Sequence, residues 1–185
     1  GLEDTGAIEQ ARIYLEGTLY EDYSYRIQVE MSDGLELKDA YGERHNLPVV
    51  DNLRVGQFKE PMGLENNTSS RYITFMARSL PQYLMPERDL GVMIYRNFWG
   101  ERIYAASGVF RDIEDEGNPG DDGNSSGGGE YSSTSRLTVL PWYEEGGLHL
   151  LHSGFSFSYR IPNDSFARLR IRPESDLAAR LTDTG

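Results

Sequence analysis

A ten-residue stretch, Tyr23 to Ser32, alternates strictly between large apolar or aromatic residues and polar ones, and this pattern narrows the possible folds most. Because successive side chains of a strand point to opposite faces, the stretch predicts a β-strand with one apolar face and one polar face. Its length matches the about 9–11 residues of a tilted membrane strand better than the about 5–6 residues of a usual globular strand. Asp33-Gly34 follows and predicts a tight hairpin turn, since both residues tolerate positive φ.

Period-two alternation recurs along most of the chain and predicts an all-β fold of about nine antiparallel strands. The expected strands are Arg12–Leu19, Tyr23–Ser32, Leu35–Glu43, Leu53–Phe58, Leu90–Tyr95, Arg102–Phe110, Tyr131–Leu140, Leu148–Ile161 and Phe166–Arg172. Asn46-Leu47-Pro48 is expected to end the third strand, and Pro141-Trp142-Tyr143 to lie between the seventh and the eighth.

Two architectures fit these strands. Short turns alternate with long connections, as in an up-and-down transmembrane β-barrel, and the aromatic residues gather near strand ends, as girdles at two bilayer interfaces would. These aromatic residues are Tyr20, Tyr23, Phe98, Trp99, Trp142, Tyr143 and Tyr159. The alternative is a soluble, secreted β-sandwich that binds carbohydrate or a polyanion, with Ile27 and Val29 buried between two sheets.

The longest excursion between strands, Gly63 to Pro81, mixes apolar and basic residues. Long loops of this kind are usually functional or disordered. If Arg71 to Ala77 forms a short helix, Arg71 and Arg78 share nearly one face, and Phe75 and Met76 can anchor the helix to a wall. We therefore expect this loop on the polar, concave side of the sheet, where it would narrow a channel.

Residues 111–130 form a second long connection, rich in glycine and acid. Between Asp112 and Glu130 there are six glycines, and six acids precede the final glutamate. Such a segment cannot bury a core, so we expect a solvated surface loop. A calcium-binding loop is the alternative, although the acids do not follow the EF-hand spacing.

Four motifs, in this order, carry a family resemblance: RVGQFKEPMGLE, SSRYITFMARSLP, ERDLGVMIYRN and RIYAASGVFRD. Together they resemble the phosphate-selective porins O and P, over roughly Ala11 to Phe110 and more weakly as far as Tyr159. The resemblance implies a sixteen-stranded, anion-preferring diffusion channel of the Gram-negative outer membrane, usually a trimer. It also implies that the third loop, here Gly63 to Pro81, folds into the lumen as a constriction.

Composition agrees with a single partial barrel domain over residues 1–185. No run approaches 18 apolar residues, so no transmembrane helix is expected, and the absence of cysteine excludes disulfides and thiolate metal sites. The chain begins GLEDTG without a signal peptide, which favours a piece of a longer protein. A net charge of −12 makes nucleic acid an improbable partner.

The charge is unevenly placed. Residues 1–51 hold 12 acids and 4 bases, whereas residues 52–110 hold 5 acids and 7 bases. The candidate constriction is therefore mildly basic, while the acid near the start opposes a strongly anion-selective lumen. The sequence supports a general passive channel for small solutes more firmly than it supports phosphate specificity.

Arginines supply the candidate site. Arg168, Arg170 and Arg172 alternate with apolar residues, so on one strand their side chains share a face at spacings of about 6.6–6.8 Å. Such a row suits an anion path, and the alternative is a solvated face of a soluble sheet. The candidate pore-lining and anion-binding residues are Arg71, Arg78, Lys59, Arg54, Arg88, Arg168, Arg170 and Arg172.

No catalytic constellation appears in the sequence, so we expect no enzyme activity and no cofactor. His45 is isolated, and His149 and His152 would point to opposite faces of a strand, so no metal site is expected. The expected partners are small solutes or inorganic anions, outer-membrane lipid and two further copies of the chain in a homotrimer.

Overall fold

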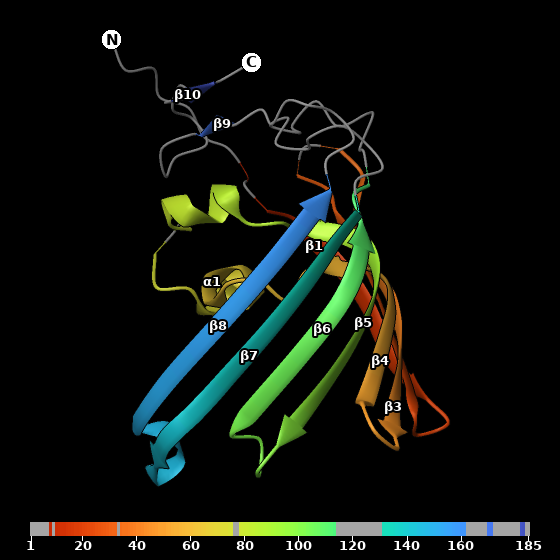
Figure 1. Ribbon diagram of the computed structural model, residues 1–185. Coiled ribbons are helices and arrows are strands. Elements are labelled where there is room, and N and C mark those ends of the chain that lie inside the picture. Colours follow the sequence, from red (N-terminus) through yellow and green to blue (C-terminus); the bar gives the residue numbers. More distant parts are fainter. Residues whose placement is uncertain are drawn as a thin grey trace.

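The computed structural model describes residues 8, 10–32, 34–75, 78–113 and 131–161, and the backbone of residues 170–171 and 182–183. Its main feature is a curved antiparallel sheet of eight strands, each hydrogen-bonded to the next along the chain (Figure 1). The strands are β1 (Arg12–Leu19), β2 (Tyr23–Glu30), β3 (Glu36–Leu47), β4 (Asp51–Lys59), β5 (Arg88–Phe98), β6 (Ile103–Arg111), β7 (Tyr131–Glu144) and β8 (His149–Ile161). This order confirms the up-and-down topology, with β1 and β8 as the two edges of the sheet.

Polar side chains are buried on the concave face of the sheet and apolar side chains are exposed on the outer face, the opposite of a sheet in a soluble protein. On β2, Gln28 and Glu30 are buried on the concave side, whereas Ile27 on the other side is 46% exposed. β1 continues the pattern, since Ile13 and Leu15 are 63% and 61% exposed. Because the apolar face is uncovered, the sandwich expectation is wrong for the described strands, and the fold is a partial up-and-down barrel.

A small apolar core lies on the concave side of β4, β5 and β6. It consists of Phe58, Met93, Ala106 and Phe110, with Tyr41, Tyr95 and Tyr104 packed against it. The rings of Phe58 and Phe110 meet edge to face, with centroids 5.6 Å apart. Gly91 makes room for this packing, because a Cβ there would lie 2.3 Å from Cδ1 of Phe110.

Two expected boundaries are wrong. Asn46 and Leu47 belong to β3, and Pro141, Trp142 and Tyr143 belong to β7. Pro141 is tolerated there because the register with β8 shifts between Val139 and Trp142, so the missing N–H costs no ladder bond. The turn before β8 is the 3₁₀ segment η3 (Glu145–Gly147).

The expected ninth strand does not extend the sheet within the described residues. Its Arg170 and Ile171 form β9 (Arg170–Ile171), which pairs with β10 (Thr182–Asp183) in a separate two-stranded sheet. The other residues of the expected strand lie outside the described residues. In the acidic connection, Arg111 belongs to β6, and residues 114–130 lie outside the described part of the chain.

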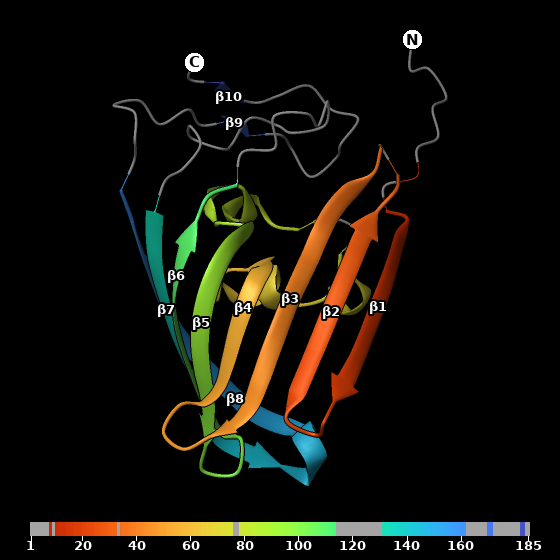
Figure 2. The same ribbon diagram turned by 90° about the vertical axis from the view of Figure 1, so that its right-hand side faces the viewer.

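Helices are few and short: α1 (Leu64–Asn67) and the 3₁₀ segments η1 (Ser70–Tyr72), η2 (Leu80–Leu84) and η3. No helix in the described residues is long and apolar enough to cross a membrane. In both ribbon views α1 lies on the concave side of the sheet, between β3 and β4 on one side and β8 on the other (Figures 1 and 2).

Candidate functional site

The segment between β4 and β5 turns away from the sheet directly after Lys59. Pro61 cannot donate to a ladder, and Gly63 takes a φ of 71°, which few other residues adopt without strain. Gly63 is also needed for close packing, because a Cβ there would lie 2.3 Å from Sδ of Met85. The backbone is thus directed onto the concave side immediately before α1 begins.

Side-chain amides hold this segment together. Asn66 is 1% exposed; its Nδ2 donates to the carbonyl of Pro86 at 2.8 Å, and its Oδ1 accepts from Nε2 of Gln82 at 3.1 Å. Asn67 donates to the carbonyls of Met62 at 2.9 Å and Gly63 at 3.1 Å. These bonds satisfy backbone groups that neither a long helix nor a sheet pairs here.

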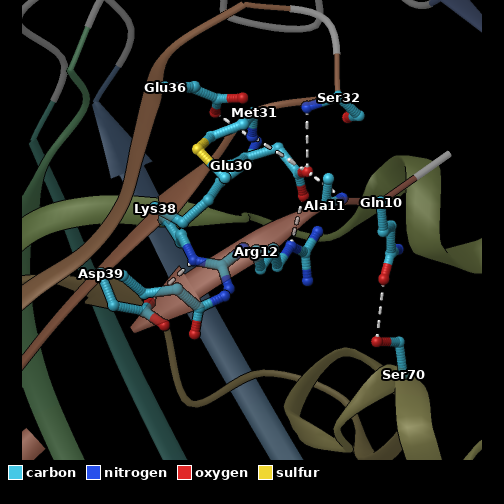
Figure 3. Close-up of polar contacts among 12 residues, drawn as sticks. Gln10, Ala11, Arg12, Glu30, Met31, Ser32, Glu36, Lys38, Asp39 and Ser70 are labelled. Atoms are coloured by element: carbon cyan, nitrogen blue, oxygen red, sulfur yellow. Dashed lines mark hydrogen bonds and ion pairs between the residues drawn. The ribbon is translucent and has the colours of Figure 1, made fainter. Parts of the chain in front are cut away.

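The segment is also bonded to widely separated strands. Arg136 of β7 donates to the carbonyl of Gly63 at 2.5 Å. Near the other edge of the sheet, Ser70 donates to Oε1 of Gln10, which precedes β1, at 3.0 Å (Figure 3). The segment therefore spans the concave face between the two halves of the sheet.

Arg54 and its neighbours show how charge is held on the wall, the concave face of β1 to β5. Nε of Arg54 donates to Oε1 of Glu43 at 2.7 Å, and the hydroxyl of Tyr95 donates to the same oxygen at 2.7 Å. The guanidinium also lies over the rings of Tyr41 at 4.4 Å and Phe58 at 5.2 Å. Its positive charge is thus offset by a carboxylate and enclosed by aromatic rings.

Other wall arginines are paired in the same way. Arg88 lies 2.8 Å from Asp39, and Arg26 lies 3.1 Å from Glu16 and 3.9 Å from Asp39.

Glu30 binds the backbone and a side chain at the start of β1, at the edge of this wall (Figure 3). Its carboxylate accepts from Nε of Arg12 at 2.5 Å and from the backbone N–H of Ala11 at 2.6 Å. The backbone N–H groups of Met31 and Ser32 donate to it as well, at 3.2 and 3.3 Å.

A second group of cations surrounds α1, and we call Lys59, Arg78 and Arg136 the loop-base cations. Nζ of Lys59 donates to the carbonyl of Asn66 at 2.6 Å, Arg78 donates to that of Thr68 at 2.7 Å, and Arg136 donates to Gly63 as above. Among the described residues no ion pair at 4.0 Å or less is found for these three cations. A carbonyl dipole offsets a full charge only in part, so these three side chains keep more of their positive charge than a paired arginine does.

Arg78 also has unused donor capacity. Its Nη1 is buried and has no hydrogen-bond partner among the described residues. Burial lowers the pKa of the Arg78 guanidinium from its usual value, opposed by Glu65 and Glu87, but arginine remains charged at neutral pH. Hydrogen bonds from the side chain and backbone of Ser79 lower the pKa of the Glu65 carboxyl.

Comparison with known proteins agrees with this geometry. The family model described as "Phosphate-selective porin O and P" matches residues 3–185. The chain belongs to this porin family. It is also 26% identical to Porin O of Pseudomonas aeruginosa over 192 aligned residues, which cover 98% of the chain and 41% of that porin. The chain therefore spans about two fifths of the length of this curated relative.

Membership of the porin O and P family assigns the chain to the outer membrane of Gram-negative bacteria. It also agrees with the exposed apolar face and the buried polar face of the sheet.

Of the candidates named from the sequence of this porin, Arg54 and Arg88 lie on the wall in ion pairs. Lys59 lies at the end of β4 and donates to the loop. Arg71 and Arg78 do not share a helix, because Ser69 caps η1, a turn of only three residues, and Ile73 is extended. Arg71 lies 6.0 Å from the ring of its neighbour Tyr72.

The remaining candidates give a mixed result. Phe75 is 75% exposed, so it does not anchor the loop to the wall, and Met76 lies outside the described residues. Arg168 and Arg172 also lie outside them, and only the backbone of Arg170 is described. The role of this arginine row remains a prediction.

Sequence reasoning missed four arginines of the concave side: Arg12, Arg26, Arg136 and Arg160. Each stands on the polar face of an alternating strand, and this signal could have identified all four. His45 is not isolated in the fold: its ring nitrogens lie 2.8 Å from Oγ of Ser24 and 2.7 Å from Oδ1 of Asn52.

Proposed function

We propose that the whole protein is a passive outer-membrane channel for small solutes that prefers anions, including phosphate. One observation carries the proposal: the concave face is lined with buried charge, and the chain between β4 and β5 crosses it. Ile13, Leu15 and Ile27 are exposed on the same face of the sheet. Such exposure is unfavourable in water, whereas the outer face of a membrane barrel places apolar side chains against lipid.

Lipid contact also accounts for exposed aromatic residues near the strand ends. Tyr20 is 91% exposed, Trp99 is 73% exposed, and Trp142 stacks on His149 with ring centroids 6.0 Å apart. Amphipathic rings of this kind favour the membrane–water interface. We infer that outer-membrane lipid covers this face, and that the whole protein forms a homotrimer as the family resemblance implies.

The anion preference would come from the loop. We propose that Gly63 to Pro81 is the constriction, and that Lys59, Arg78 and Arg136 raise the anion concentration beside it. Low-dielectric walls focus the field of such charges in a narrow passage. The acid of residues 111–130 would lie at the surface, beyond about 8–10 Å of screening at physiological salt, and would contribute less.

Planar-bilayer recording of the full-length protein tests this function. In a salt gradient the reversal potential should show anion preference. Replacing Arg71 and Arg78 together with alanine should shift it towards the cation side, more at low salt than at high salt. The matched control is Arg44→Ala with Arg96→Ala, because alternation places both arginines on the outer face.

The control should leave the potential nearly unchanged. A protein that forms no channel, a cation-selective parent channel, or equal shifts in the two double variants would contradict the proposal.

A further inference from the structure

Glu60, the residue directly after β4, is fully buried although it carries a carboxylate. Its Oε1 accepts from Oγ of Ser132 at 2.7 Å and from Nη2 of Arg160 at 2.8 Å. The hydroxyl of Thr134 donates to Oε2. A buried carboxylate is tolerated only when it is paired and hydrogen-bonded in this way.

These partners are not neighbours of β4 in the sheet. Ser132 and Thr134 lie on β7 and Arg160 on β8, and β5 and β6 separate β4 from both strands. The contacts therefore do not belong to a strand ladder; they join distant parts of the wall across the concave side. This connection starts at the residue where the chain leaves the sheet.

The backbone of Glu60 joins the beginning and the end of the loop. Its N–H donates to the carbonyl of Glu87, just before β5, at 3.0 Å. Its carbonyl accepts from Nδ2 of Asn67, the last residue of α1, at 3.3 Å. One residue thus contacts the exit of the loop, its first helix and the far wall.

A second buried acidic side chain shares the guanidinium of Arg160. Nη2 of Arg160 lies 2.8 Å from Glu60 and 3.3 Å from Oδ2 of Asp89, so one guanidinium serves two buried carboxylates. Replacing a buried ion pair by apolar residues is often neutral or stabilising, so stability alone is a weak reason for such a cluster. A need to hold the loop in one fixed position explains the buried cluster better than stability does.

We propose that Glu60 is a positioning residue of the channel, which sets the place of the constriction by holding the base of the loop to β7 and β8. The inference rests on the proposed function, since it explains how the loop proposed as the constriction is held in place. Glu60 touches no solute in this role: it acts through Gly63 to Asn67 and the loop-base cations beside them.

The test uses the full-length protein with Glu60→Ala and, as matched control, Glu101→Gln, which neutralises an exposed carboxylate in the short turn between β5 and β6, outside the loop. Loss of a charged, buried hydrogen-bond partner should raise the population of displaced loop positions on the order of tenfold. Single-channel current should then fluctuate between levels, and the reversal potential should move towards zero. The control should keep the steady current and the potential of the parent.

A merely structural role would lower the heat stability of the barrel and leave selectivity and current noise unchanged, and this result would overturn the proposal. If Glu60→Ala fails to assemble, Ser132→Ala with Thr134→Val decides, because it removes two donors and keeps every charge. Parent-like current noise in that assembled variant would also overturn the proposal.

Current noise separates this inference from the proposed function. A cation-selective parent contradicts the anion preference, yet the comparison of noise between parent and variant still decides the part played by Glu60.

Discussion

The wall of the sheet and the base of the loop hold their positive charges in different ways. On the wall, arginines face carboxylates: Arg12–Glu30, Arg26–Glu16, Arg54–Glu43 and Arg88–Asp39. At the base of the loop, Lys59, Arg78 and Arg136 donate to backbone carbonyls. Both regions are rich in cations, but within the described residues only the cations of the second lack a carboxylate within 4.0 Å.

The difference indicates where selectivity can arise. An ion pair has little net charge at a distance, so the paired wall offers polar groups to a solute without strongly favouring either sign. Uncompensated cations beside a narrow passage attract anions. A channel whose chain carries more acidic than basic residues can therefore still favour anions at the height of the loop.

The largest expected effect comes from breaking a buried wall pair. Glu43→Ala leaves the guanidinium of Arg54 among aromatic rings without a carboxylate, which should cost about 3–5 kcal/mol of stability. Urea unfolding in detergent micelles measures the loss. Glu16→Ala is the control, because Glu16 is 55% exposed in its pair with Arg26 and should cost at most about 1 kcal/mol. Equal losses would show that the wall pairs are not buried as described.

A smaller effect is expected inside the loop. Asn66→Ala removes the bonds to Pro86 and Gln82 and leaves buried polar groups unpaired, at about 1–3 kcal/mol. The cost should fall on the loop alone, so protease cleavage between residues 63 and 81 should accelerate while the barrel stays intact. Asn97→Ala, an exposed position near the far end of β5, is the control. Unchanged cleavage would mean that the amide contacts do not hold the loop.

Neutralising an exposed wall pair should have less effect still. Glu16→Gln together with Arg26→Gln leaves the net charge of the wall unchanged. The reversal potential should therefore stay close to that of the parent, and stability should change by about 1 kcal/mol or less. A clear shift of the potential would show that the wall contributes to selectivity despite its pairing.

The smallest effect concerns pH. Hydrogen bonds from Ser79 lower the pKa of Glu65, so this contact stabilises the loop above the ordinary pKa and is lost as pH falls through the lowered value. Ser79→Ala should return the pKa of Glu65 towards its usual range and remove this small stabilisation of the loop at pH 7. An NMR titration of the labelled Glu65 carboxyl measures the shift. An unchanged pKa in the variant would mean that Ser79 is not its cause.

Local patterns in the sequence predicted the sheet well. The faces of β1 and β2 follow from alternation alone, and the register places Glu43 opposite Arg54 across a short connection, so that pair was within reach of sequence reasoning. The β7 boundary failed because a register shift accommodates Pro141, and no local signal announces such a shift.

The loop was harder to predict because its contacts are not local. Ser69 caps a three-residue turn where a helix was expected, and Phe75 stays exposed because amides and cations hold the segment in place of apolar packing. The partners of Glu60 lie 72 to 100 residues away in the sequence, so only the folded chain shows that it holds the loop.

The most direct test of the central claim compares the reversal potentials of two double variants of the full-length channel in a salt gradient. One neutralises Lys59 and Arg78 with glutamine, and the other neutralises the wall pair of Glu16 and Arg26 in the same way. We expect the loop variant to lose anion preference by roughly fivefold, equivalent to about 1 kcal/mol, and the wall variant to keep it. Equal shifts in both variants, or a shift in the wall variant alone, would contradict the claim that selectivity arises at the base of the loop.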